Sequence, residues 1–106
     1  MNWENEIFQI ISNGGDAKAI AYEALDLAYE GKFDQAREKM AEAQKVLNLA
    51  HNTQTKLIQY ELNNKGVEIS LLMVHAQDHL MTAISEMSLI EQMIKLLQRI
   101  DALEKK

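Results

Sequence analysis

The chain contains no cysteine and no proline among its 106 residues. Without cysteine it can form neither a disulfide nor a thiolate site, and this indicates a protein of a reducing compartment. Without proline, nothing in the sequence breaks a helix sterically or fixes a rigid turn. Only four glycines are present, so we expect long helices with few connections between them.

Basic residues are also scarce, with 11 Lys and Arg against 16 Asp and Glu and a formal net charge of −5. A nucleic-acid-binding protein needs a basic face to neutralise phosphates, so this charge argues against that class. Aliphatic runs such as residues 71–74 are far shorter than the roughly 20 apolar residues that span a bilayer. The acidic N-terminus lacks the basic region of a signal peptide. We therefore expect a cytoplasmic protein with no direct membrane insertion.

The residues that dominate the sequence are those that favour helices, namely Ala, Leu, Glu, Lys, Gln and Met. Glycine-containing segments at residues 31–32 and 63–66 mark two turns. Around these turns, apolar residues recur every three or four positions, which predicts helices over about residues 3–30, 33–63 and 68–103. We expect an all-α fold, an antiparallel three-helix bundle that forms a single domain over residues 1–106.

The expected core consists of the apolar residues that recur at this spacing. They are Ile7, Ile11, Gly14, Ala21, Leu25 and Ala28 in the first segment, Phe33, Ala36, Met40, Ala43, Leu47, Ala50 and Leu57 in the second, and Leu72, Ala76, Ala83, Met87, Ile90, Ile94 and Leu97 in the third. In the first segment, Gly14 and Gly15 could end a helix or permit a kink. We interpret the segment as one kinked helix.

A polar stripe interrupts the apolar pattern of the third segment. At helical spacing, His75, Asp78, Thr82 and Ser85 share one face, and His79 lies one turn beyond His75. Ionisable groups in place of leucines cost desolvation energy unless they are paired or reach water. The stripe is therefore the candidate functional site.

Three interpretations of this stripe remain open from the residues alone. Two histidines at positions i and i+4 could bind a metal ion, although the zinc-protease motif has glutamate where this chain has Ala76. The pair could also be structural and satisfied inside the bundle. The third interpretation is nucleophilic, because a neutral imidazole attacks phosphorus readily, and His79 and Gln77 offer donors to phosphoryl oxygens. The chain has no glycine-rich nucleotide loop, so other proteins would have to load and unload such a group.

Two segments carry a resemblance to a known family. They are residues 50–58, Ala-His-Asn-Thr-Gln-Thr-Lys-Leu-Ile, and residues 74–81, Val-His-Ala-Gln-Asp-His-Leu-Met. Together with residues 21–25 and 31–33, they resemble the lactose/cellobiose (N,N'-diacetylchitobiose) enzyme IIA family of the phosphoenolpyruvate-dependent sugar phosphotransferase system. The resemblance covers almost the whole chain. It implies a homotrimer of three-helix subunits whose third helices surround a shared axis.

The resemblance also implies roles for the residues of the second segment. His75 corresponds to the phosphoryl acceptor, and Gln77 and His79 match positions expected to steady the phosphoryl group. Asp78 matches a residue near the three-fold axis that binds a divalent cation, which we expect to be Mg²⁺. The donor would be the phosphocarrier protein HPr, and the acceptor a cysteine of enzyme IIB. The form of the motif favours a β-linked disaccharide as the transported sugar.

Two other functions remain alternatives to this phosphoryl carrier. One is the histidine phosphotransfer domain of two-component signalling, which is also a helical bundle, although the residues after His75 do not resemble it. The other is a non-catalytic helical adaptor whose polar stripe sets the register of an oligomer. In the first segment of the resemblance, His51, Gln54 and Thr55 either lie near the active site of a neighbouring subunit or provide polar packing between helices.

Overall fold

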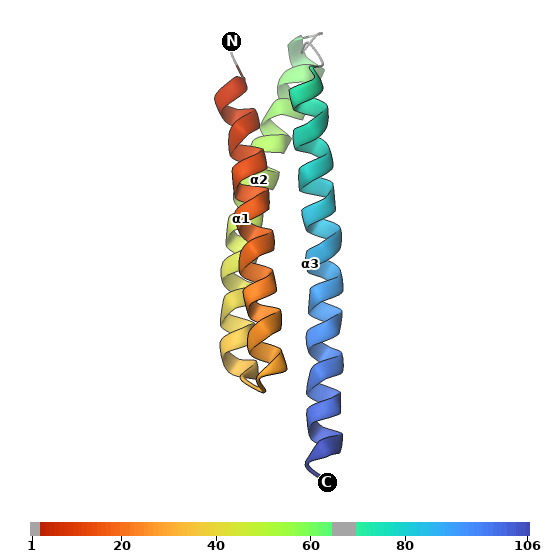
Figure 1. The fold of residues 1–106 in the computed structure, drawn as a ribbon. Coiled ribbons are helices and arrows are strands. Elements are labelled where there is room, and N and C mark those ends of the chain that lie inside the picture. The colour runs from red at the N-terminus through yellow and green to blue at the C-terminus, as the bar shows by residue number, and fades with distance from the viewer. Residues whose placement is uncertain (1–2, 65–69) are drawn as a thin grey trace.

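The computed structural model describes residues 3–64 and 70–106, and these residues form three helices. They are α1 (Glu4–Tyr29), α2 (Phe33–Asn64) and α3 (Leu71–Glu104). α1 and α3 run in one direction and α2 in the other, so the molecule is a rod of 61 × 20 × 16 Å (Figure 1). The all-α, three-helix prediction is confirmed. No helix within residues 3–64 and 70–106 is long and apolar enough to cross a membrane.

The turn between α1 and α2 is built around Gly31. Its φ is +79°, a left-handed conformation that glycine adopts without steric cost. The Gly31 N–H donates to the Ala28 carbonyl at 3.0 Å, and the Lys32 N–H donates to the Leu27 carbonyl at 2.9 Å. This pair of hydrogen bonds satisfies the last carbonyls of the helix in a Schellman motif. The predicted turn at residues 31–32 is therefore confirmed.

The start of α3 differs from the prediction. The sequence indicated a helix from about residue 68, but α3 begins at Leu71, and residues 68 and 69 lie outside the described residues. Ser70 is extended, and its hydroxyl accepts a hydrogen bond from the Met73 N–H at 3.1 Å. This N-cap satisfies one of the amides that a helix leaves unpaired at its start, and it fixes where α3 begins.

The core lies where α1 meets the other two helices. α3 packs mainly on α1 and makes few contacts with α2. Most predicted core positions are buried, but five are only partly buried and pack against the edge of the core: Ile11, Phe33, Met40, Leu72 and Leu97. Ile10 and Leu80, which were not in the predicted core, are among the largest fully buried side chains. The prediction was wrong for Ile11 because both Ile10 and Ile11 fit a helical spacing, and Ile10 faces the centre.

α1 is continuous through Gly14 and Gly15, which confirms a single helix in the first segment. A Cβ on Gly14 would lie 4.0 Å from the Cα of Leu80, and one on Gly15 would lie 4.0 Å from Cε1 of His79. The missing side chains let α1 and α3 approach closely at this level. The approach brings α1 beside the polar stripe. At the opposite end, α3 continues past the α1–α2 turn (Figure 1).

Candidate functional site

The polar stripe lies on the surface of the N-terminal half of α3. His75, Asp78, Thr82 and Ser85 are exposed, and His79 is partly buried. Because α3 is one unbroken helix, the prediction that these residues share a face is confirmed. An exposed His75 also argues against a histidine pair satisfied inside the bundle, since that interpretation needs buried rings.

The rings of His75 and His79 lie against each other. Their centroids are 5.2 Å apart and their planes meet at 65°, an edge-to-face arrangement. A group attached to the His75 ring would therefore lie within reach of His79. Among the described residues, no group of three or more His, Cys, Asp or Glu side chains is placed to hold a metal ion. Within one chain the histidine pair thus lacks the third ligand that a metal site needs.

Gln77 lies on a different side of α3 from His75. Two residues apart in an α-helix means a rotation of roughly 200°. Gln77 points towards α2, where the Gln54 side-chain amide donates a hydrogen bond to the Gln77 carbonyl oxygen. Gln54 therefore provides polar packing between helices, one of the two interpretations open from the sequence. Within one chain, Gln77 is not brought to His75.

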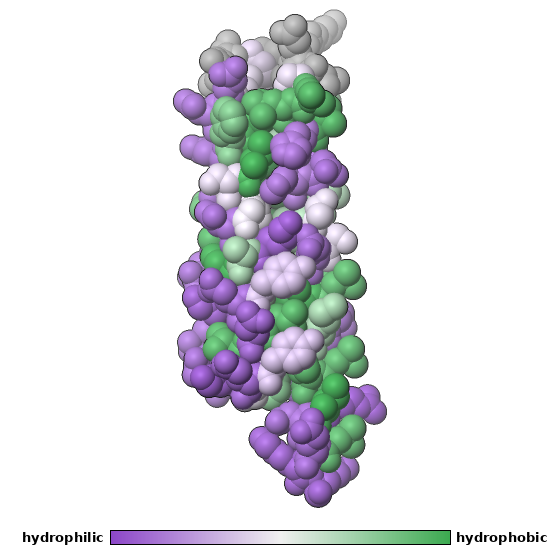
Figure 2. Space-filling view, in the orientation of Figure 1, coloured by the Kyte–Doolittle hydropathy of each residue, from purple (hydrophilic) through white to green (hydrophobic). Residues whose placement is uncertain are grey.

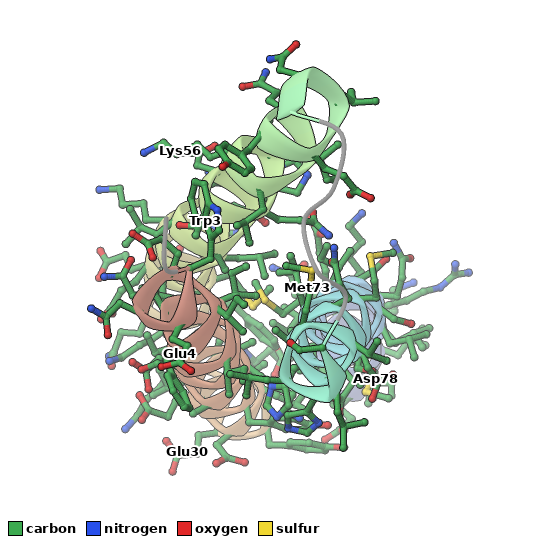
Figure 3. All side chains as sticks on the ribbon, turned by 90° about the horizontal axis from the view of Figure 1, so that it is seen from above. Trp3, Glu4, Glu30, Lys56, Met73 and Asp78 are labelled. Atoms are coloured by element: carbon green, nitrogen blue, oxygen red, sulfur yellow. The ribbon has the colours of Figure 1, made fainter. Side chains whose placement is uncertain are left out.

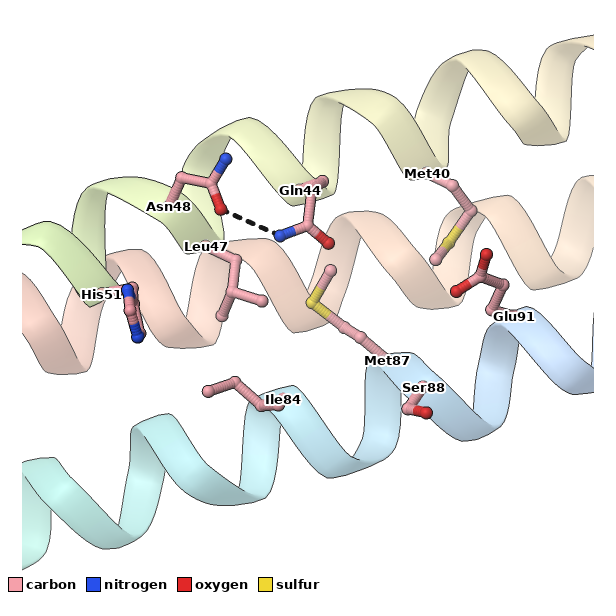
Figure 4. A pocket seen from close by; sticks show the side chains of 9 residues that line it. All are labelled: Met40, Gln44, Leu47, Asn48, His51, Ile84, Met87, Ser88 and Glu91. Atoms are coloured by element: carbon pink, nitrogen blue, oxygen red, sulfur yellow. Dashed lines mark hydrogen bonds between the residues drawn. The ribbon is translucent and has the colours of Figure 1, made fainter.

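His51 and Thr55 also lie away from His75. The Thr55 hydroxyl donates to the His51 carbonyl within α2 at 3.0 Å. The exposed His51 ring lines a groove of about 370 Å³ between α2 and α3 (Figure 4). Apolar residues such as Leu47 and Met87 line the same groove together with polar ones. The first segment of the resemblance thus meets the second at Gln77, whereas His79 of the second segment lies beside Gly15 of α1.

A polar network joins α1 to α3 two turns below His79. Lys18 Nζ lies 3.2 Å from Glu86 Oε2, and the Tyr22 hydroxyl donates to Glu86 Oε1 at 2.7 Å. The Tyr22 hydrogen bond, followed by the one from Lys18, lowers the pKa of Glu86, and the same bond raises the pKa of Tyr22. Sequence reasoning missed this network because its members are on different helices, and only Tyr22 lies in a segment that carries the resemblance.

The outward face of α3, on the side away from α1 and α2, carries large exposed apolar side chains. They are Leu71, Val74, Met81, Leu89, Leu96 and Leu103. Asp78 lies among them, on the side of α3 away from the other helices (Figure 3). Figure 2 shows apolar and polar side chains alternating along α3. A long exposed apolar face marks a surface that another protein surface would cover.

Comparison with known proteins points to one family. The family model described as "PTS system, Lactose/Cellobiose specific IIA subunit" matches residues 5–98. A relative from Bacillus subtilis (strain 168) is the "Lichenan-specific phosphotransferase enzyme IIA component". It is 44% identical over 102 residues, which cover 94% of this chain and 93% of the relative.

Two solved structures share the fold. The PTS cellobiose-specific enzyme IIA from Bacillus anthracis has a TM-score of 0.91 and 43% identity, covering 96% of this chain and 94% of that one. The IIA(chitobiose)–HPr complex of the N,N'-diacetylchitobiose branch of the Escherichia coli phosphotransferase system has a TM-score of 0.85 and 37% identity. This match covers 95% of this chain and 98% of the other.

Proposed function

The chain belongs to the lactose/cellobiose-specific IIA family of the sugar phosphotransferase system, and we propose that its His75 carries a phosphoryl group between two partner proteins. One observation supports His75 above all. It is exposed on α3, with the His79 ring 5.2 Å away and edge-on. An exposed imidazole can meet a donor and an acceptor protein in turn, while its neighbour hydrogen-bonds the phosphoryl oxygens.

The two transfers follow from imidazole chemistry. In loading, a lone pair of the neutral His75 ring forms the N–P bond while phosphorus leaves its donor atom in phosphorylated HPr, which keeps the electron pair. In unloading, a cysteine thiolate of enzyme IIB forms an S–P bond, the N–P bond breaks and its electrons return to His75. HPr as donor is supported by the Escherichia coli relative, which was solved in complex with HPr. This chain has no cysteine, so the accepting thiol has to come from another protein.

Three copies of the chain would associate through the outward face of α3. Residues three and four positions apart follow this face over the length of the helix: Leu71, Val74, Asp78, Met81, Ser85, Leu89, Gln92, Leu96, Arg99 and Leu103. This is the spacing of helices packed in a coiled coil, with two successive intervals of four around Ser85 that would unwind it locally. His75 and Gln77 lie on opposite flanks of this face. In a parallel trimer, Gln77 of one copy would therefore face His75 of the next.

Asp78 would bind a divalent cation at the axis of such a trimer. Three carboxylates would converge there, and unit charges ~4 Å apart repel by roughly 4 kcal/mol at an effective dielectric constant of 20. The exposed Asp78 carboxylate fits a hard cation such as Mg²⁺, which prefers oxygen ligands. The cation would supply charge neutralisation between the subunits. Phosphoryl transfer itself would be carried out by His75.

The transported sugar would be a β-linked disaccharide, and the chain would act in the cytoplasm. The solved relatives are described as specific for cellobiose and N,N'-diacetylchitobiose, and both of these sugars are β-linked. Two features support the location, namely the absence of cysteine and the lack of a membrane-spanning helix in the described residues.

Incubation with enzyme I, HPr and phosphoenolpyruvate tests the function directly. The chain should acquire acid-labile phosphate, and His75→Ala should abolish it while circular dichroism shows unchanged helicity. His51→Ala is the matched control, since His51 is also exposed but lies on α2, and it should be labelled normally. A helical adaptor would acquire no phosphate, and a two-component phosphotransfer domain would be loaded from a receiver aspartate and not from HPr. Labelling of the His75→Ala chain would show that the acceptor is a different residue.

A further inference from the structure

Phosphorylation of His75 would place new negative charge in an acidic region of the chain. A phosphoryl group adds roughly 1.5 to 2 negative charges at neutral pH, and Asp78 lies within one turn. Positive charge is scarce on the two helices beside the site. α1 contains a single basic residue, Lys18. The basic residues of α3, Lys95 and Arg99, lie roughly 30 Å or more further along the helix than His75.

Lys18 lies between the histidines and Glu86, in the contact between α1 and α3. Gly15 of α1 is opposite His79 of α3, where a Cβ added to the glycine would lie 4.0 Å from Cε1 of the ring. Tyr22 is opposite Glu86, through the 2.7 Å hydrogen bond. Lys18 comes three residues after Gly15 and four before Tyr22, about 4.5 Å and 6 Å along the helix from each. Its flexible four-carbon side chain can therefore extend to either level.

The route from Lys18 towards the histidines passes over Gly15, which is partly exposed. Side chains of a helix lean towards its N-terminus, over the residues three and four positions earlier. For Lys18 these positions are Gly15 and Gly14, which have no side chains of their own; Gly14 is buried against Leu80, and the His79 ring borders the space above Gly15. The Lys18 side chain is 33% exposed, so it can move without unpacking the core. On α2, by contrast, Lys56 points away from α3 (Figure 3).

Glu86 is held in place independently of Lys18. Tyr22 binds its Oε1 and Lys18 contacts its Oε2. The Tyr22 hydrogen bond is also the main cause of the lowered pKa of Glu86. Glu86 therefore keeps its position and its charge if Lys18 leaves. Since the ion pair is partly exposed, its loss costs the fold little.

From these relationships we infer that Lys18 is a mobile counter-ion, paired with Glu86 when His75 is free and with the phosphoryl group when His75 is loaded. This inference rests on the proposed function of His75. Glu86 competes with the phosphoryl group for the same ammonium group. The pair Lys18–Glu86 thus sets the equilibrium of phosphoryl transfer from HPr. Lys18 favours the phosphorylated state of His75, and Glu86 opposes it.

The equilibrium constant for transfer from phosphorylated HPr tests the inference. It is measured by mixing phosphorylated HPr with the chain and quantifying both phosphoproteins by ³¹P NMR. Lys18→Met should lower the constant about tenfold, the effect of one partly screened charge-assisted contact. Glu86→Gln should raise it about threefold, because glutamine still accepts the Tyr22 hydrogen bond but no longer competes for Lys18. In the double variant, Glu86→Gln should add nothing to Lys18→Met.

A second ion pair provides the matched control. Lys39 Nζ lies 3.2 Å from Glu23 Oε2 and joins α2 to α1, so Lys39→Met and Glu23→Gln should leave the constant unchanged. Lys18→Met and Glu86→Gln break the same ion pair, so a purely structural role would move the constant in the same direction in both variants. That result, with a wild-type chain that loads normally, would overturn this inference alone. A wild-type chain that takes no phosphate from HPr would overturn the proposed function as well.

Discussion

Gln54 of α2 donates a side-chain hydrogen bond to Gln77 of α3, and this bond joins two helices that otherwise make few contacts. It ties the C-terminal part of α2 to the first turns of α3. It also orients the Gln77 side chain towards α2, on the flank of α3 opposite to His75. The orientation of this side chain is therefore set by a neighbour within the same chain.

Replacing Gln54 with alanine should destabilise the chain. The partly buried Gln77 carbonyl would lose its partner, and the free energy of unfolding should fall by about 1 kcal/mol. Urea unfolding followed by circular dichroism measures this change. Gln44→Ala is the control, because the Gln44–Asn48 hydrogen bond of 2.9 Å lies within α2 and is exposed. It should change stability by less than ~0.5 kcal/mol. Equal losses of unfolding free energy in both variants would show that the bond between α2 and α3 stabilises the chain no more than an exposed bond within α2.

Two adjacent residues of α3 should respond differently to truncation. Leu80 is 0% exposed, and Leu80→Ala should cost about 2–5 kcal/mol of unfolding free energy because it leaves a cavity in the core. Met81 is 58% exposed on the outward face. Met81→Ala should leave the subunit fold intact and weaken the proposed trimer.

Light scattering over a dilution series separates these two effects. The wild-type chain should scatter as three copies, and Met81→Ala should dissociate at a higher concentration than the wild type. A wild-type chain that is monomeric at micromolar concentration would contradict the trimer. Unfolding measured at a fixed protein concentration then gives the loss of unfolding free energy in Leu80→Ala.

Replacing Asp78 with leucine should stabilise the proposed trimer. The substitution removes three converging carboxylates and extends the apolar outward face, so the melting temperature should rise and become insensitive to chelators. The wild-type trimer should melt earlier when EDTA removes its cation. Asp16→Leu serves as the control, since Asp16 is an exposed carboxylate on α1. If Asp78→Leu lowered the melting temperature, and EDTA did not change the melting temperature of the wild-type trimer, Asp78 would not lie on the axis.

Glu86 should make stability depend on pH in the acid range. Its pKa is lowered by the hydrogen bonds from Tyr22 and Lys18, so the unfolded chain binds a proton more readily and stability rises with pH through this window. The contribution is fully present above the unfolded-state pKa of about 4.3 and is lost as pH falls through the lower folded-state value. The difference in urea midpoint between wild type and Glu86→Gln should therefore shrink from about pH 6 to about pH 3. A difference that stays constant would rule out this linkage, and Glu23→Gln controls for general effects of charge.

The features of the fold that could be predicted from the sequence are those with local causes. The α1–α2 turn was predictable because Gly31 is the residue that adopts a positive φ there. The start of α3 depended on which polar residue caps it, and Ser70 was not recognised as that cap. Leu80 was overlooked because it follows a polar motif, although the spacing Ala76, Leu80, Ala83 would have identified it.

The same distinction between local causes and contacts across helices applies to the candidate site. His75 and His79 could be paired from the sequence because residues four apart on a helix are neighbours. The partner of Gln77 and the contacts of Glu86 could not, because they depend on how separate helices align along their length. The packing of Gly14 against Leu80 belongs to that alignment, and neither residue reveals its partner from its own position in the sequence.

The part of α3 beyond the α1–α2 turn makes amide hydrogen exchange a measure of assembly. The C-terminal end of α3 extends past the α1–α2 turn (Figure 1), and Leu103 is 59% exposed. Backbone amides in such a fraying end exchange quickly with solvent. A trimer that covers Leu103 would slow exchange at this end. Because His75 lies roughly 40 Å away along the same helix, deuterium uptake at the C-terminal end would follow subunit association separately from events at the histidine.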